Sequence, residues 1–294
     1  MKRSLHLPML ALTFALTACS GADLLNSLVP GDGYHVIRDL RYGDGPRRTL
    51  DLYVPEGAAP AAPTIVFFYG GGWESGSKDD FVFVGQAFAS RGYVTAIPDY
   101  RVYPEARFPM FLEDAAAAVA WVRANTDQTR AAAGPVYLVG HSAGAHIAAM
   151  LTLDNTWLAE VGNKVCEAIV ATAGLAGPYD FLPLRSATLK DIFGSESSRP
   201  QTQPINHVDG TAPPMLLITG TADTTVLPRN SARLAARIRN SGGIAEERSY
   251  DGIGHIELVA SLAVPLHSLA PALDDIDRFF RRHPVGGSSC RGSG

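Results

Sequence analysis

Short apolar runs recur along the chain, and polar turns or segments of helical periodicity separate them. The length and composition of these runs are typical of buried strands. The runs that we predict as strands are residues 50–54, 64–68, 94–97, 136–139, 168–172, 215–218 and 244–250.

Helical spacing marks several of the segments between these strands. Apolar side chains in residues 109–123 recur three or four positions apart, and residues 230–239 and 270–280 show the same pattern. Arg281 and Arg282 follow the last segment, where positive charges favour a helix end. Strands that alternate with helices predict an α/β protein with a mostly parallel, doubly wound sheet and helices on both faces.

Composition favours one large domain. The chain has 294 residues, of which 46% are apolar and 18% charged, enough for a single core that we place in residues 35–283. Residues 19–34 lack periodicity and predict a tether, and residues 284–294 predict a disordered tail. Residues 177–208 interrupt the alternation with many polar residues and prolines, which leaves a short cap and a plain surface connection equally open.

Charge and cysteine content narrow the function classes. The net charge is −4, and no lysine or arginine cluster could follow a phosphate backbone, so we expect no nucleic acid partner. The 3 cysteines and 8 histidines show none of the spacings of metal sites, so we expect no metal. A disulfide between Cys166 and Cys290 is open.

The N-terminus has the features of an export signal. Lys2 and Arg3 precede an apolar stretch, residues 5–16, that is too short to span a bilayer. The sequence Leu-Thr-Ala-Cys that ends at Cys19 resembles the lipobox of bacterial lipoproteins. The resemblance implies a signal peptide at residues 1–18, a lipid on Cys19, and outer-membrane retention because Ser20 rather than aspartate follows. An ordinary cleaved signal peptide is the alternative.

The most informative motif is Gly-His-Ser-Ala-Gly at residues 140–144. It follows a predicted strand and precedes small, helix-prone residues, so Ser142 lies at the apex of a strand–turn–helix unit. The glycines on both sides allow a turn sharp enough to raise the hydroxyl above the sheet edge. Ser142 is therefore a candidate nucleophile, although a serine at this place can also simply cap a helix.

The C-terminal third supplies a base and a carboxylate. Asp223 lies just beyond the predicted strand 215–218, and His255 follows a glycine-containing turn after the strand 244–250. The order Ser142, Asp223, His255 is typical of an α/β-hydrolase. We expect structural roles for the neighbours His141 and His146, with the His141 side chain directed away into packing. The remaining candidate carboxylates are Asp180, Asp209 and Asp251.

A glycine run offers amides for an oxyanion hole. Tyr-Gly-Gly-Gly-Trp at residues 69–73 follows the predicted strand 64–68, and backbone without Cβ atoms can closely approach a substrate. Together with the amide of Ala143 this loop is a plausible hole. Two roles are open for Trp73, in the acyl pocket or as an anchor of the loop in the core.

These motifs together resemble the α/β-hydrolase esterases, specifically the bacterial carboxylesterases related to hormone-sensitive lipase, over nearly the whole mature chain. Further matching strings are Asp-Tyr-Arg at 99–101, Pro-Glu at 104–105, Phe-Pro at 108–109 and Glu-Asp at 113–114. The resemblance implies Ser142 as nucleophile, His255 as base, Asp223 as its orienting group, and the amides of Gly71, Gly72 and Ala143 as oxyanion donors. It implies structural roles for Asp99, Arg101 and Asp114.

Tyr69 departs from the family pattern, because the family usually has histidine at this position. The hydrogen bonds that brace the loop must therefore come from a phenol or from other groups. The sequence favours a serine esterase of small carboxylic esters that needs no cofactor. An amidase, formamidase or peptidase on the same fold is the first alternative, and a catalytically silent binding module of the envelope is the second.

Overall fold

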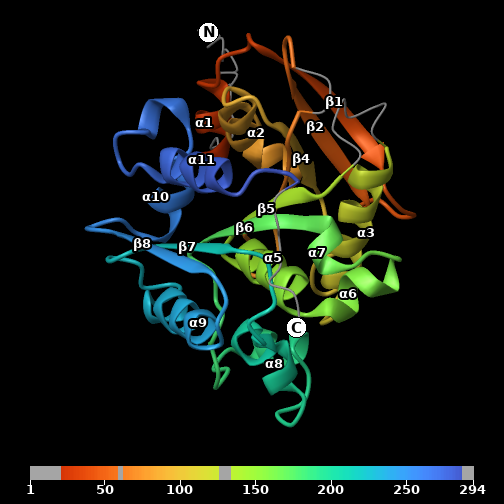
Figure 1. Ribbon diagram of the computed structural model, residues 1–294, viewed down its shortest axis with the longest axis vertical. Coiled ribbons are helices and arrows are strands. Elements are labelled where there is room, and N and C mark those ends of the chain that lie inside the picture. Colours follow the sequence, from red (N-terminus) through yellow and green to blue (C-terminus); the bar gives the residue numbers. More distant parts are fainter. Residues whose placement is uncertain (1–20, 59–61, 126–133, 287–294) are drawn as a thin grey trace, which may run out of the picture.

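The computed structural model describes residues 21–58, 62–125 and 134–286, which form an 8-stranded, mostly parallel sheet between two layers of helices (Figure 1). The strand order is β1-β2-β4-β3-β5-β6-β7-β8, in which β2 pairs antiparallel with both β1 and β4 and the remaining pairs are parallel. The strands are β1 (Tyr34–Arg41), β2 (Thr49–Pro55), β3 (Thr64–Phe68), β4 (Val94–Pro98), β5 (Val136–His141), β6 (Ile169–Leu175), β7 (Met215–Gly220) and β8 (Ala245–Tyr250).

Helices cover both faces of the sheet (Figure 1). One layer contains α1 (Gly21–Ser27), α2 (Val82–Ala89), α10 (His255–Ala260) and α11 (Ala272–Arg282). The other contains α3 (Met110–Ala124), α5 (Ala143–Leu153) and α9 (Arg229–Asn240), with α6 (Asn155–Glu160) and α7 (Val165–Ala168) beside them. This is the α/β-hydrolase fold, so the predicted fold class is confirmed.

Each predicted strand is present, with ends within a few residues of those expected. The central strands β3, β4, β5, β6 and β7 are buried on both faces, which explains why their sequences read as continuous apolar runs. The three predicted helices correspond to α3, α9 and α11. Pro271 occupies the N-cap of α11, and Arg281 and Arg282 lie in its last turn.

Two elements near the N-terminus differ from the prediction. The strand β1 was not predicted, because it lies at the sheet edge, half exposed, and carries charged side chains. Residues 21–27, predicted as part of an irregular tether, form α1, and Leu25 packs against the core. The prediction of a tether is wrong for this helix, because Leu25 anchors it on the hydrophobic core.

The buried apolar side chains form one large cluster and a smaller one under α9. The strand β7 separates them, since Leu216 and Ile218 belong to the large cluster whereas Met215 and Leu217 belong to the small one. This alternation follows from the two-residue period of a strand. The large cluster contains side chains from helices on both faces of the sheet, so the single core expected from the sequence is divided only around β7 and α9.

The segment 177–208 folds into short helical turns: α8 (Ala187–Ile192), η2 (Arg199–Thr202) and η3 (Pro204–His207). It is neither a cap over the serine nor a loose connection. Phe181 and Phe193 pack against Trp73, with ring centroids 5.9 and 4.8 Å away. The Oδ1 atom of Asn230 in α9 accepts hydrogen bonds from the backbone amides of Tyr179 and Asp180 and thereby holds the start of the segment.

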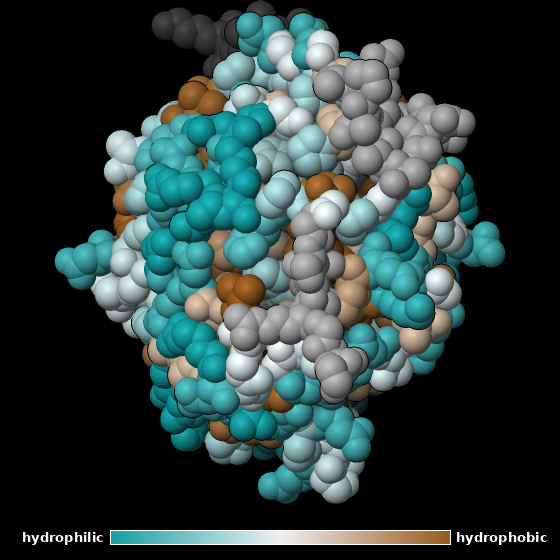
Figure 2. Space-filling view, viewed as in Figure 1, coloured by the Kyte–Doolittle hydropathy of each residue, from teal (hydrophilic) through white to brown (hydrophobic). Residues whose placement is uncertain are grey.

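The direction in which the strands follow one another changes at the middle of the sheet. From β3 the chain moves to β4 on one side, and it then returns to β5 on the other side of β3. In such open sheets, ligands bind beyond the carboxyl ends of the strands at this switch point. The visible face in Figure 2 is largely hydrophilic with small, separate apolar patches.

Several sequence predictions fall outside the described residues. These are the signal peptide at 1–18, Cys19, Cys290 and most of the tail at 284–294. Cys166 is disulfide-bonded, and its pairing with Cys290, which the sequence leaves open, involves a residue outside the described part of the chain. Among the described residues no helix is long and apolar enough to cross a membrane.

Candidate active site

Ser142 lies at the turn between β5 and α5 with a strained backbone. Its φ is 54° and its ψ −121°, a backbone conformation that residues other than glycine rarely adopt. A Cβ atom on Gly140 would overlap the backbone of Gly144, and a Cβ atom on Gly144 would overlap the carbonyl oxygen of Phe68. Both glycines are therefore needed for the turn, as the motif predicted.

Asp223 is fixed by burial and by two backbone amides. It follows β7, and its side chain is fully buried. Its Oδ1 atom accepts hydrogen bonds from the amides of Thr225 at 2.9 Å and Val226 at 2.8 Å. The second oxygen is left for another donor.

His255 bridges Asp223 and Ser142. Its Nδ1 atom lies 2.8 Å from Oδ2 of Asp223, and its Nε2 atom lies 2.9 Å from Oγ of Ser142. A carboxylate can only accept, so the proton of the neutral ring is assigned to Nδ1, which leaves the Nε2 lone pair directed at the serine hydroxyl. The three predicted residues, which are far apart in the sequence, thus form one hydrogen-bonded row.

The other candidate carboxylates have partners elsewhere. Asp180 forms an ion pair with Arg233, Asp209 accepts from Thr211, and Asp251 accepts from the hydroxyl of Thr221. Asp223 alone of the four contacts His255.

The two neighbouring histidines differ in role. His146 is buried and hydrogen-bonds the carbonyl of Thr202, which confirms a structural role. His141 does not point away as predicted: its ring lines the pocket, lies 4.8 Å from that of His255, and binds the His255 carbonyl through Nε2 at 3.1 Å. Burial, together with the nearby His255, lowers the pKa of His141 to about 3, so it stays neutral and positions the base.

The glycine loop after β3 faces the same pocket. Gly71 and Gly72 have φ values of 126° and 64°, and the carbonyl of Gly71 accepts the amides of Glu74 and Ser75 in a tight turn. A Cβ atom on Gly71 would overlap the carbonyl oxygen of Ser75. Ala143 begins α5, so its amide lies among those that have no partner within the helix. Trp73 is buried against Phe181 and Phe193 and anchors the loop rather than lining the pocket.

The phenol of Tyr69 braces this loop. It donates a hydrogen bond of 2.7 Å to Oδ1 of Asp99 and accepts one of 3.0 Å from Arg47. Its backbone carbonyl accepts from the hydroxyl of Tyr100, whose ring stacks on that of Tyr69. The departure from the family's histidine is thus compensated by a buried network.

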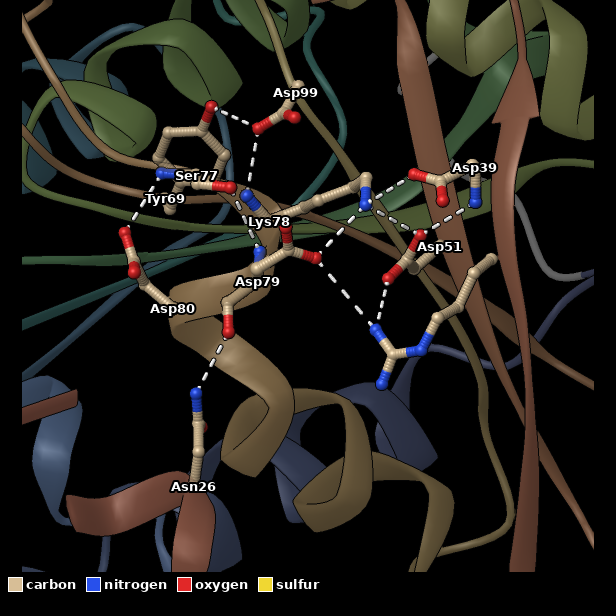
Figure 3. A network of polar contacts seen from close by, with 10 residues as sticks. Asn26, Asp39, Asp51, Tyr69, Ser77, Lys78, Asp79, Asp80 and Asp99 are labelled. Carbon is tan, nitrogen blue, oxygen red and sulfur yellow. Dashed lines mark hydrogen bonds and ion pairs between the residues drawn. The ribbon is translucent and has the colours of Figure 1, made fainter. Parts of the chain in front are cut away.

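The network continues through Lys78 (Figure 3). The backbone amide of Lys78 donates to the same Asp99 oxygen at 2.8 Å. Its buried Nζ forms ion pairs with three carboxylates, those of Asp39, Asp51 and Asp79, at 2.8, 3.0 and 3.0 Å. Burial alone would lower the pKa of this amine, but the hydrogen bonds to the three carboxylates raise it, so the charge is retained. The loop is therefore tied to β1 and β2.

Asp99, Arg101 and Asp114 are structural, as expected. Asp114 is fully buried and forms ion pairs with Arg48 at 2.6 Å and Arg101 at 2.8 Å. These contacts join α3 to the segments after β1 and β4. Among the described residues no group of His, Cys, Asp or Glu has an arrangement that could hold a metal ion.

A pocket of about 640 Å³ opens over Ser142. Its walls are mainly apolar and include Phe81, Phe83, Ile256 and Val259. Sequence reasoning missed these residues and also Gly21, Ala22 and Leu25 of α1. The apolar pair Leu24–Leu25 followed by Leu28 was the available signal, since these positions share a helical period.

The fold and the row of serine, histidine and aspartate define an α/β-hydrolase. Residues 50–238 match the BD-FAE family, and the chain belongs to that family. The esterase relationship expected from the sequence is confirmed at this level, while the closer relation to hormone-sensitive lipase stays a prediction.

Three known proteins illustrate the relationship. A probable isoprenylcysteine alpha-carbonyl methylesterase of Arabidopsis thaliana is 30% identical over 246 residues, 76% of this chain and 52% of the plant protein. A kynurenine formamidase of Drosophila melanogaster is 24% identical, with 82% of this chain and 79% of the fly protein covered. The esterase Est2 of Thermogutta terrifontis superposes with a TM-score of 0.66 at 25% identity, over 84% of this chain and 91% of Est2. The chain spans about half the length of the plant relative.

We predict that Gly144→Ala disrupts the turn that carries Ser142. The added methyl would overlap the Phe68 carbonyl, so we expect a loss of about 2–4 kcal/mol in the free energy of unfolding, measured in urea. The control is Gly31→Ala, where nothing lies within 4 Å, and its stability should stay within about 0.5 kcal/mol of wild type. Equal stability of both variants would contradict this account of the turn.

We also predict that Tyr69→Phe impairs catalysis more than its cost in stability explains. Loss of the hydroxyl leaves Asp99 with one donor fewer and frees the glycine loop, so kcat should fall about tenfold with little change in KM. Tyr93→Phe is the control, because it removes a similar buried bond to Asp277 at the opposite end of the sheet. An equal kcat in both variants would show that the bond does not position the loop.

Proposed function

We propose that the protein is a serine carboxylesterase that hydrolyses carboxylic esters of short acyl chains through an acyl-enzyme. The observation that carries the proposal is the position of His255, within hydrogen-bond distance of both Ser142 and Asp223. This arrangement matches the roles of nucleophile, base and orienting carboxylate in serine hydrolases. The esterase relatives support the same reaction class.

In the first half of the reaction Ser142 Oγ attacks the ester carbonyl carbon, and its proton moves to Nε2 of His255. The negative charge that develops on the carbonyl oxygen is stabilised by the amides of Gly71, Gly72 and Ala143. Asp223 accepts the hydrogen bond from Nδ1–H of His255 throughout, which orients the ring and stabilises the imidazolium. The carbon–oxygen bond to the alcohol then breaks, and His255 returns its proton to the leaving alcohol.

In the second half a water molecule attacks the acyl-enzyme. His255 accepts the proton of that water, a second tetrahedral species forms at the same amides, and its collapse releases the carboxylic acid and restores the Ser142 hydroxyl. The two half-reactions together consume only one water molecule and one ester molecule. The narrower assignment to short acyl chains rests on the absence of a long lid in the sequence and on the modest pocket over Ser142.

The direct test is hydrolysis of p-nitrophenyl acetate and butyrate by residues 21–294. Ser142→Ala and His255→Gln should each lower kcat by about 10⁴-fold or more, and Asp223→Asn by about 10³- to 10⁴-fold. A fluorophosphonate probe should label wild type but not Ser142→Ala, which also tests the alternative of a silent binding module. Full activity of Ser142→Ala would refute the proposal, and Ser90→Ala serves as the matched control.

A formamidase or amidase is the second candidate, and the kynurenine formamidase relative favours it. Acyl transfer to serine uses the same groups for both leaving groups. We predict that kcat/KM for phenyl butyrate exceeds that for butyranilide by at least about 10²-fold, because an anilide nitrogen must be protonated before it leaves. The one further carboxylate among the described pocket residues, that of Asp80, accepts the backbone amide of Ser77. A preference for the anilide, or for an N-formyl substrate, would favour the second candidate.

We further propose that the protein is a lipoprotein of the bacterial envelope, anchored through Cys19 and retained at the outer membrane. The lipobox resemblance, the basic and apolar N-terminus and Ser20 support this location. The disulfide at Cys166 fits an oxidising compartment.

A further inference from the structure

The helix α1 forms one wall of the pocket that contains Ser142. Gly21, Ala22 and Leu25 line this pocket together with Ile256 and Val259 of α10. Leu25 also packs against the main hydrophobic cluster. The segment directly after the proposed anchor is therefore part of the active-site architecture and not a loose tether.

Asn26 fixes α1 in this place. Its Nδ2 atom donates to the carbonyl of Asp79 at 2.8 Å, as Figure 3 shows, and its Oδ1 atom accepts from the amide of Phe83 at 3.2 Å. Asp79 in turn forms an ion pair with Lys78 of the network that braces Tyr69. The wall of the pocket and the glycine loop are thus held by one connected set of contacts.

The proposed lipid attachment site is close to this wall. Cys19 precedes Gly21 by two residues, and consecutive Cα atoms are about 3.8 Å apart, so their Cα atoms are separated by at most about 7.6 Å. A lipid on Cys19 would therefore enter a bilayer within about a nanometre of the pocket.

Exposed aliphatic side chains lie on the two helices that line the pocket or directly beside them. Leu24 and Leu28, in α1 and just after it, are 60% and 53% exposed, and Ile256, which lines the pocket, is 66% exposed. These are the most exposed large apolar side chains among the described residues. We call Leu24, Leu28 and Ile256 the apolar rim.

We propose that the apolar rim rests on a phospholipid bilayer, so that the pocket draws its ester from the membrane and not from water. The substrate is then an ester with one aliphatic chain dissolved in the bilayer and a small acyl group that reaches Ser142. Aliphatic rim residues bind at the boundary of headgroups and acyl chains, and a covalent lipid adds to their affinity. This inference rests on the proposed esterase activity and on the proposed anchor at Cys19.

The experiment compares two butyrate esters that give the same acyl-enzyme. Full-length lipidated protein is placed on vesicles of phosphatidylethanolamine and phosphatidylglycerol, with p-nitrophenyl butyrate in the water or hexadecyl butyrate in the bilayer. We expect Leu24→Ser/Leu28→Ser to lower the rate on hexadecyl butyrate by about tenfold or more and to leave the soluble ester unchanged. The control Ile244→Ser/Val285→Ser, which removes exposed side chains outside the pocket, should change neither rate.

A second variant keeps the wild-type apolar rim and lengthens the segment between the proposed anchor at Cys19 and α1. A flexible Gly-Ser linker of about 12 residues between Ser20 and Gly21 adds a reach of about 20 Å and should also slow only the membrane ester. Unchanged rates on hexadecyl butyrate in both variants would overturn the inference. It would also be overturned if wild type incorporated no more radiolabelled fatty acid than Cys19→Ala. Failure of wild type to cleave p-nitrophenyl butyrate would instead refute the esterase proposal itself.

Discussion

The hydrogen bonds that His255 makes to Asp223 and Ser142 are the interaction on which the site depends. They require that three strand ends meet, because Ser142 follows β5, Asp223 follows β7 and His255 follows β8. The parallel sheet brings these strand ends together, since the carboxyl ends of its strands lie along one edge. The fixed carboxylate of Asp223, held by two amides, then sets the orientation of the imidazole, and His141 supports the His255 backbone from the other side.

A second constraint concerns the glycine loop. Glycine adopts the positive φ values of Gly71 and Gly72 readily, so their conformation alone does not fix the loop. The loop is fixed by a network of Tyr69, Asp99 and Lys78. The phenol reaches Asp99 directly, and its ring is stacked between those of Tyr100 and Phe81. Burial raises the pKa of Asp99, and the hydrogen bonds from Tyr69 and Lys78 act in the opposite direction. These two bonds therefore offset part of the free-energy cost of burying the carboxylate.

Sequence reasoning succeeded where one local pattern determines the result. The buried strands read as apolar runs, and Gly140, Ser142 and Gly144 encode a turn that few other residues could form. It failed where structure depends on tertiary partners. The edge strand β1 is half exposed and charged, α1 is too short to form alone, and its position depends on Asn26 and on the core beneath Leu25. The direction of the His141 ring likewise depends on a carbonyl 114 residues away in sequence.

The central claim is that Ser142, His255 and the loop amides act together on one carbonyl group. The most direct measurement is a crystal structure of the protein inactivated with a p-nitrophenyl butylphosphonate. The account predicts phosphorus bonded to Ser142 Oγ, with the phosphoryl oxygen about 2.7–3.1 Å from the amides of Ala143 and of Gly71 or Gly72. Phosphorus on another residue, or a phosphoryl oxygen directed away from these amides, would contradict it.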